Sequence, residues 1–306
     1  MDTLEKKFII TVDTEGDNQW RTWNGGVTTT ENAKCIPHFQ DTCESFGFKP
    51  VYLLTYEMAL DRPLATYLKR KVLAGQCEIG MHLHAWSSPP AYPLARRYKG
   101  NPYITEYPDE VMFEKMGMLT SCISDHLEVT PVSHRAGRWA SSQQMFQVLS
   151  ELGYFVDCSV VSGWNASKIV GQTIAEGFDY RDCAKKAYWI NEQLLEVPMI
   201  INRHHGFSGD TFRQKLGHLL KGRDRWLRPA QTDLAGMKWQ LAHGADDYSM
   251  FMIHSTELMP GGSPYFGTSE EVEYEFEMIK SLFTEAAKTH TGCTLEQYYN
   301  EKRRQK

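Results

Sequence analysis

The sequence predicts an α/β fold in which mostly parallel strands form a closed barrel surrounded by helices. Apolar, strand-like runs alternate with helix-like segments along most of the 306 residues, a pattern typical of a parallel sheet covered by helices. About seven such strands occur, which favours a barrel over an open sheet. No internal repeat or linker marks a second domain. We therefore expect one domain over residues 1–306, with an inserted hairpin and basic helical segment at about 180–245.

The first third of the chain contains three predicted strands and two predicted helices. The strands are short apolar runs, and the helices lie between them. Thr30 is a candidate N-cap, and Gly47 and Gly75 follow the helices where glycine commonly ends them. In order, the elements are a strand at 8–13, a helix at 30–46, a strand at 50–56, a helix at 57–74 and a strand at 77–84.

The rest of the chain continues this alternation. A long amphipathic helix begins with Pro108 and two acidic residues, which suit a helix N-terminus. The segment 187–202 predicts a hairpin or two short strands. The other elements are a helix at 108–129, a strand at 131–137, a helix at 141–153, a strand at 154–160, helices at 209–222 and 229–243, a strand at 248–254 and a helix at 268–288.

Composition excludes several classes of protein. A net charge of -5 and a pI near 6.1 argue against a general nucleic-acid binder. No apolar run is long enough to span a bilayer. The N-terminal residues lack the apolar core and cleavage site of a signal peptide, so we expect a cytoplasmic location. There, the seven scattered cysteines are expected to be free thiols.

Polar side chains gather where the predicted strands end. In a parallel barrel these ends share one face, and the chemistry is carried there. The residues are Asp13 and Glu15 after the first strand, His82 and His84 at the third, His134 and Arg135 at the fourth, Asp157 at the fifth, and His254 and Glu257 at the last. Their convergence on one face of the predicted barrel indicates an active site.

Two of these groups have the spacing of metal ligands. Asp13 and Glu15 are two residues apart, as are His82 and His84, so each pair projects to one side of its strand. A solvated loop would also explain the acids, and a polar cleft the histidines. Taken together, the pairs favour a site of two histidines and one carboxylate, with a position left open for the water that hydrolysis requires.

Arg135 and His254 each have a structural explanation as an alternative to a catalytic one. A guanidinium at Arg135 would hold a neighbouring carboxylate ionised and oriented, but a surface arginine that caps a helix is also compatible. His254 ends a strand with no other strongly polar side chain, where a histidine satisfied within the core is the alternative.

The motifs that contain these residues resemble those of the polysaccharide deacetylase, or NodB-homology, family. They are TVDTEGD, EIGMHLHAW, SHRAGRW, VDCSV and MFMIHSTEL, in the family's order. The resemblance covers roughly residues 9–264 and is closest to a branch with an HLH motif and an HSxELMPGGSP segment, here HSTELMPGGSP. It implies a distorted barrel of seven or eight β/α units, a divalent metal (zinc, or cobalt, manganese or nickel) and hydrolysis of an N-acetyl group on an amino sugar.

The resemblance also implies roles for single residues. Asp13 matches the general base, and Arg135 matches the arginine that pairs with it. His82 matches the first metal histidine. His254 matches the general acid, and Asp157 matches the acidic residue that tunes this histidine.

The chain departs from the family at two metal ligands. The family's second carboxylate stands where this chain has Thr14, so Glu15 is the expected substitute. The second family histidine stands where this chain has Trp86, so we expect His84 to be the third ligand.

The function implied by the resemblance is a metal-dependent carbohydrate N-deacetylase, a hydrolase of carbon–nitrogen bonds in linear amides, in surface-polysaccharide or glycoconjugate biosynthesis. Two alternatives stay open. One is a related C–N hydrolase for a small amide or an N-formyl sugar, and the other is a non-catalytic carbohydrate-binding barrel. We expect substrate contacts from Trp86, Arg138, Trp139 and Glu257, with core packing as the alternative for the aromatic rings.

A local basic patch stands out in this acidic chain. It lies at 213–229 and predicts contact with the phosphate of a lipid- or nucleotide-linked sugar, or peripheral contact with an anionic membrane. A solvated helix face is the alternative. Its basic residues are Arg213, Lys215, Lys221, Arg223, Arg225 and Arg228.

Overall fold

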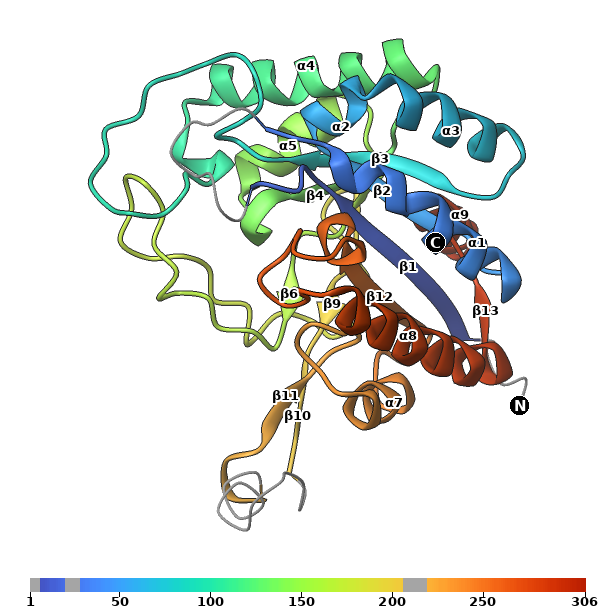
Figure 1. Cartoon of the computed structure of the whole chain (residues 1–306). Coiled ribbons are helices and arrows are strands. Elements are labelled where there is room, and N and C mark those ends of the chain that lie inside the picture. The colour runs from blue at the N-terminus through green and yellow to red at the C-terminus, as the bar shows by residue number, and fades with distance from the viewer. Residues whose placement is uncertain (1–5, 20–27, 206–218) are drawn as a thin grey trace.

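The computed structural model describes residues 6–19, 28–205 and 219–306. Its centre is a curled, mostly parallel sheet with helices packed around it (Figure 1). Within the described residues, only the β7–β8 pair of this sheet is antiparallel. The strand order is β12 (Tyr248–His254), β1 (Lys6–Thr14), β2 (Pro50–Leu54), β3 (Glu78–Leu83), β4 (Ser133–Ala136), β5 (Val156–Asp157), β8 (Leu195–Glu196) and β7 (Tyr188–Trp189), and β13 (His290–Gly292) pairs with the start of β1. The predicted distorted (β/α) barrel is confirmed, but within the described residues the sheet is not closed, since β12 and β7 are its two edges.

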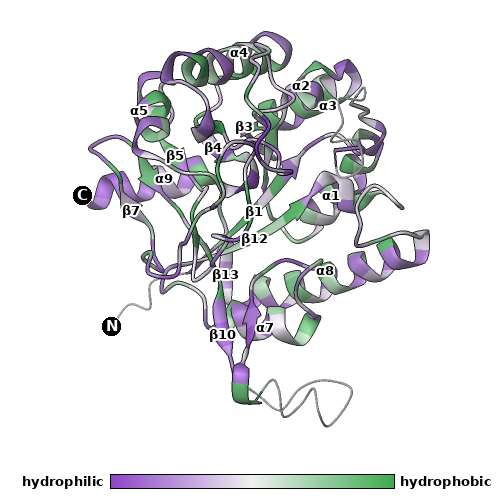
Figure 2. Ribbon diagram, turned by 90° about the vertical axis from the view of Figure 1, so that its left-hand side faces the viewer, coloured by the Kyte–Doolittle hydropathy of each residue, from purple (hydrophilic) through white to green (hydrophobic). Residues whose placement is uncertain are grey.

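The helices have clear sequence signals at their ends. Ser142, Thr268 and Thr294 each accept a hydrogen bond from a backbone N–H in the first turn of the helix that follows, as N-caps do. Figure 2 shows both apolar and polar residues along α8, as expected for a helix with one face on the sheet. The helices are α1 (Ile36–Ser45), α2 (Tyr56–Leu60), α3 (Arg62–Leu73), α4 (Asp109–Leu127), α5 (Gln143–Glu151), α7 (Leu234–Ala242), α8 (Ser269–Thr289) and α9 (Leu295–Gln305).

Strand alternation decides which side chains point into the barrel. On β12, Ile253 packs in the core beneath the helices, whereas Met252 belongs to the core inside the barrel. Because side chains alternate along a strand, His254 returns to the inner side. On β1, Val12 likewise faces the helices, so the next residue, Asp13, faces inward. The two polar strand ends therefore share one space.

The predicted single helix at 57–74 is wrong, because the chain forms two helices there. α2 ends at Leu60, and Asp61 caps α3 by accepting a hydrogen bond from the backbone N–H of Leu64. Pro63 lies in the first turn of α3, where its missing N–H leaves no helical hydrogen bond unmade. Within a longer helix the same proline would have broken the hydrogen-bond ladder.

Other boundaries differ from the predictions at the insertion and at the C-terminus. The predicted helix at 229–243 begins only at Leu234, after the cap residue Asp233. The predicted helix at 209–222 lies outside the described residues except for 219–221, which are helical. Residues 223–225, which we expected in a basic helical segment, form a strand. β13 and α9 were not predicted at all.

A two-stranded arm projects from the barrel (Figure 1). Its strands are β10 (Asn202–His204) and β11 (Arg223–Arg225), which pair antiparallel; nearby, β6 (Val161–Ser162) pairs with β9 (Met199–Ile200). At the base of the arm, Leu227 forms a parallel bridge with Phe251 of β12, and its carbonyl accepts a hydrogen bond from the N–H of Met252. In the part of the chain that is described, no helix is both long and apolar enough to cross a membrane.

Candidate active site

The carboxyl ends of four strands meet at a pocket of about 240 Å³. Sheet register aligns its polar residues, since Asp13 of β1 lies opposite His254 of β12 and His82 of β3 lies opposite Arg135 of β4. The predicted convergence of the strand-end groups is therefore present for these residues. The pocket is lined by Asp13, Glu15, His82, His84 and His254, and all five are buried.

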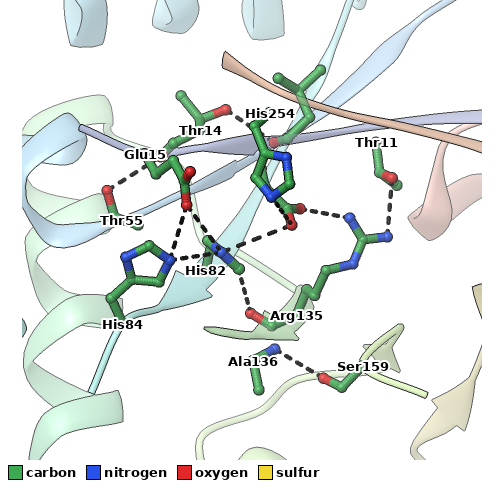
Figure 3. Close-up of polar contacts among 12 residues, drawn as sticks. Thr11, Thr14, Glu15, Thr55, His82, His84, Arg135, Ala136, Ser159 and His254 are labelled. Atoms are coloured by element: carbon green, nitrogen blue, oxygen red, sulfur yellow. Dashed lines mark hydrogen bonds and ion pairs between the residues drawn. The ribbon is translucent and has the colours of Figure 1, made fainter. Parts of the chain in front are cut away.

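Glu15, His82 and His84 form a compact cluster of metal-ligand types (Figure 3). Oε2 of Glu15 lies 3.0 Å from Nε2 of His84 and 3.9 Å from Nε2 of His82. The two Nε2 atoms are 3.1 Å apart. One carboxylate oxygen and two imidazole nitrogens that converge in this way fit a divalent metal with positions left for water or substrate.

The tautomer of His82 suits a metal ligand. Its Nδ1 lies 2.8 Å from the backbone carbonyl oxygen of Arg135, which can only accept a hydrogen bond. Nδ1 therefore carries the proton in the neutral ring, and the lone pair of Nε2 faces the cluster. Such a backbone contact is the usual way in which a metal-binding histidine is oriented.

Asp13 is held by a buried ion pair. Nη1 of Arg135 lies 2.5 Å from Oδ1 of Asp13, and Nη2 of the same guanidinium donates to the hydroxyl of Thr11 at 3.0 Å. The ring of Trp139 packs 4.7 Å from the guanidinium carbon. Oδ2 of Asp13 is left facing the pocket, 3.8 Å from Nε2 of His82 and 3.9 Å from Nε2 of His254.

Charge and burial set the protonation of these groups. Burial alone would raise the pKa of Asp13, but the charge of Arg135, assisted by His82 and His254, lowers it well below the usual range. Burial lowers the pKa of His82 to about 4, so the ring is neutral at pH 7. Burial opposes protonation of His84, yet the hydrogen bond to Glu15 raises its pKa. A metal at this site would therefore compete with a proton for His84.

His254 faces Asp13 with one ring nitrogen and Glu257 with the other. Its Nδ1 lies 2.9 Å from Oε1 of Glu257, which comes from the 3-10 turn Ser255–Leu258 that directly follows β12. Nη2 of Arg228 lies 3.0 Å from the same oxygen. Glu257, which we expected to contact substrate, is fully buried behind His254.

Asp157 lies elsewhere. Its carboxylate accepts a hydrogen bond from Nδ1 of His134 at 2.6 Å and another from the hydroxyl of Ser159 at 2.8 Å. The described contacts give it none with His254, whose acidic partner is Glu257. The sequence offered a signal for this difference, because Glu257 follows His254 by one helical turn of spacing.

The expected substrate-contact residues Trp86, Arg138 and Trp139 all line the pocket. The ring of Trp86 stacks on that of His84, with centroids 4.3 Å apart. Arg138 and Trp139 both have positive φ angles, of 60° and 59°, which are uncommon for residues with a Cβ and which aim these side chains at the pocket rim. Asn101 lines the pocket too, and nothing in the sequence singled it out.

Two residues of the basic segment that we expected at the surface are buried instead. Arg225 and Arg228 are 4% and 5% exposed, and Arg228 lines the pocket. The half-exposed Arg223 lies 3.8 Å from Asp233. Arg213 and Lys215 lie outside the described residues. Sequence reasoning missed the inward position of Arg228, because a run of basic residues normally indicates a solvated face.

Comparisons with known proteins are informative at the level of structure. No family model and no curated protein sequence matches the chain. Among solved structures, the chain is similar to a Mycobacterium smegmatis protein provisionally classed as a polysaccharide deacetylase, with a TM-score of 0.54, 12% identity and coverage of 98% of this chain and 92% of the other. The chain shares this barrel fold.

A second similar structure has a different activity. The 4-alpha-glucanotransferase of Thermococcus litoralis aligns with a TM-score of 0.57 and 14% identity over 97% of this chain, but over only 40% of its own length. Identities this low establish the fold alone. Because a fold can host unrelated reactions, the function has to be argued from the residues in the pocket.

Proposed function

We propose that the protein is a metal-dependent N-deacetylase that removes the acetyl group from an amino sugar. The observation that carries the proposal is the arrangement of Glu15, His82 and His84 beside the Asp13–Arg135 ion pair, with His254 on the far side of the same small pocket. The motif resemblance and the barrel shared with the Mycobacterium smegmatis protein support it.

The residues present can perform amide hydrolysis. When bound by Glu15, His82 and His84, a divalent metal would lower the pKa of water and polarise the acyl carbonyl. Asp13, kept ionised by Arg135, accepts a proton from the attacking water through Oδ2. His254 donates a proton from Nε2 to the departing nitrogen, so that the product leaves as a neutral amine.

The proposal also covers the group to which the amino sugar is attached. Arg138 lines the pocket, and its guanidinium donates to the backbone carbonyls of Asn101 and Val170. Among the described residues, no carboxylate lies within ion-pair distance of it. A cation whose hydrogen bonds go to neutral backbone carbonyls suits a phosphate-bearing substrate, so we propose a lipid- or nucleotide-linked amino sugar.

The test is acetate release from a panel of N-acetylated sugars: free, nucleotide-linked, lipid-linked and polymeric. We expect one divalent metal per chain in protein purified without chelator, and turnover that a chelator abolishes. His82→Ala should empty the site, whereas Asp13→Asn should keep the metal and lose turnover. A metal-free but active protein would overturn the metal-dependent mechanism.

Other outcomes would select another function. Metal-loaded protein that releases no acetate from any sugar but hydrolyses small amides or N-formyl sugars would be a related C–N hydrolase. Protein that binds sugar, but binds no metal and hydrolyses no substrate of the panel, would be a carbohydrate-binding barrel. Loss of metal in Asp13→Asn would show that Asp13 is a ligand and not the base.

A further inference from the structure

We propose that Glu257 and Arg228 are positioning residues that hold His254 in the one tautomer able to protonate the leaving amine. The inference rests on the proposed deacetylation, because it concerns the departure of the amine in that reaction. It assigns to Glu257 the role that the family resemblance implies for Asp157.

The first step of the argument is the contact between His254 and Glu257. The carboxylate oxygen of Glu257 lies 2.9 Å from Nδ1. An ionised carboxylate can only accept a hydrogen bond, so Nδ1 carries a proton and donates a hydrogen bond to Glu257. Nε2 is then the nitrogen that gains and loses the catalytic proton, and it is the one that faces Asp13 at 3.9 Å.

The second step is the ionisation of Glu257. Burial would raise the pKa of this carboxyl, but the charge of Arg228 and the hydrogen bond to His254 lower it. Nη2 of Arg228 donates to the same oxygen, Oε1, at 3.0 Å. Two donors that share one acceptor must lie close together, which accounts for the 3.1 Å between Nη2 of Arg228 and Nδ1 of His254.

The other acid in this region does not compete for the histidine. Glu275 of α8 is fully buried, and neither of its carboxyl oxygens has a hydrogen-bond partner among the described residues. Burial, reinforced by the charge of Glu257, raises its pKa to about 10. Glu275 is therefore neutral at pH 7, which leaves Glu257 as the negative charge that Arg228 and His254 share.

Both partners are rigidly placed relative to β12. Glu257 is three residues from His254 in a buried 3-10 turn. Arg228 comes from a distant part of the sequence, but Leu227 beside it is bridged to Phe251 of β12 and hydrogen bonded to Met252. The pairing of Leu227 with β12 at the base of the arm therefore fixes the position of the Arg228 guanidinium in the site.

With these assignments, every proton in the proposed reaction has a donor and an acceptor. Asp13 takes one proton from water as the hydroxyl adds to the acetyl carbon. The C–N bond breaks, and its electron pair takes the proton that protonated His254 held on Nε2. The products are acetic acid and a neutral amine, with Asp13 protonated and His254 neutral. Transfer of a proton from Asp13 to His254 through solvent restores the starting state.

The experiment compares substrates that differ in their leaving group. An amide nitrogen must be protonated to leave, whereas the nitrophenolate of 4-nitrophenyl acetate leaves without a proton. In Glu257→Gln we expect kcat on the N-acetyl sugar to fall by about 10²–10⁴-fold, the usual contribution of a general acid. We expect ester hydrolysis to change by less than about fivefold and metal content to stay the same.

The matched control is Glu275→Gln, which changes a buried carboxyl near the same arginine but not one that contacts His254. Its amide turnover should equal that of the wild type. Equal losses on amide and ester in Glu257→Gln, or equal losses in the two variants, would overturn the proposal. If Glu257→Gln fails to fold, Arg228→Lys carries the same comparison, with the same amide-selective loss expected.

A spectroscopic measurement separates this inference from the proposed function. Nitrogen-15 NMR of the zinc-loaded wild type, with the His254 signals assigned from His254→Asn, reports which ring nitrogen bears the proton. We expect the neutral ring to be protonated on Nδ1. Protonation on Nε2 would refute the positioning role even if acetate is released. Absence of acetate with Nδ1 protonated would refute the proposed reaction and leave the hydrogen-bond assignment intact.

Discussion

The backbone carbonyl of Arg135 lies 2.8 Å from Nδ1 of His82, its register partner on the neighbouring strand. The side chain of the same arginine holds Asp13. One residue of β4 therefore orients a candidate metal ligand through its main chain and the candidate base through its guanidinium. The two effects can be separated by mutation, because a side-chain substitution leaves the carbonyl in place.

Arg135→Met should destabilise the fold while keeping the metal ligands in position. Removal of the guanidinium leaves the carboxylate of Asp13 buried without its partner, which typically costs ~3–5 kcal/mol. Denaturant unfolding of the metal-free protein measures the loss. The double variant Asp13→Asn/Arg135→Met should recover part of it, since no uncompensated charge remains. An unfolding midpoint equal to that of the wild type would contradict the prediction.

Metal affinity should weaken as the pH falls. Without metal, the pKa of His84 is raised by Glu15, so in acid a metal has to compete with a proton for Nε2. Titration with zinc at several pH values should show affinity rising with pH until His84 is neutral. Glu15→Gln removes the acidic partner and one ligand, so its binding should be weaker at every pH and less pH-dependent. A pH-independent affinity in the wild type would count against Glu15 and His84 as ligands.

Glu275→Gln should stabilise the protein above neutral pH. The pKa of this carboxyl is about 10 in the folded protein and 4.5 when unfolded, so the folded state holds the proton more tightly. The protonated Glu275 therefore contributes fully to the free energy of unfolding below pH 4.5, the pKa in the unfolded protein. This contribution is lost progressively as the pH rises from about 4.5 to about 10. The glutamine variant lacks this loss, which these two pKa values put at about 5 kcal/mol near pH 8.

Thermal unfolding at acidic and alkaline pH measures the effect of Glu275. Glu277→Gln is the matched control, because Glu277 lies on the same helix but its side chain is 62% exposed and paired with Lys280. It should leave the pH dependence unchanged. A Glu275→Gln variant that unfolds with the pH profile of the wild type would show that the carboxyl is not protonated in the folded state.

Arg138→Gln should raise KM for a phosphate-linked sugar by about tenfold or more, the value of one charge-assisted hydrogen bond. A free N-acetyl sugar should be affected much less, because it lacks the phosphate. Steady-state kinetics on the two substrates gives the comparison. Arg181→Gln is the control, since Arg181 is an exposed arginine paired with Asp179. Equal rises in KM for both substrates would indicate that Arg138 only ties Asn101 and Val170 together.

The sequence predicts the barrel and the metal cluster because both follow from local periodicity. Strand ends at Asp13, His82 and His254 could be located from apolar runs, and parallel strands must bring such ends together. The helix α9 could not be found this way. Its buried residues Leu295, Tyr298 and Tyr299 are few among many charged neighbours, so its apolar stripe is faint.

The partners of His254 show a different limit of prediction from sequence. Arg228 reaches the site from an inserted arm, and no local pattern specifies where an insertion returns to the barrel. The acidic partner was sought at Asp157 on the strength of a motif match, but His134, opposite Asp157 in register, occupies that carboxylate. Which of two acids pairs with a histidine depends on strand register and turn geometry, and the sequence pattern alone specifies neither.

The two strands of the arm end side by side, since Asn202 lies opposite Arg225 at the barrel and His204 lies opposite Arg223 at the other end of the β10–β11 ladder. A segment whose two ends are paired in this way can be exchanged without altering the course of the chain on either side. Residues 205–222 are therefore a natural position for protein engineering, where a short turn, an affinity tag or a surface anchor could be grafted. The boundary of such a graft is Trp226: beyond it the chain is joined to β12, and a shift of one residue would carry Arg228 out of the pocket.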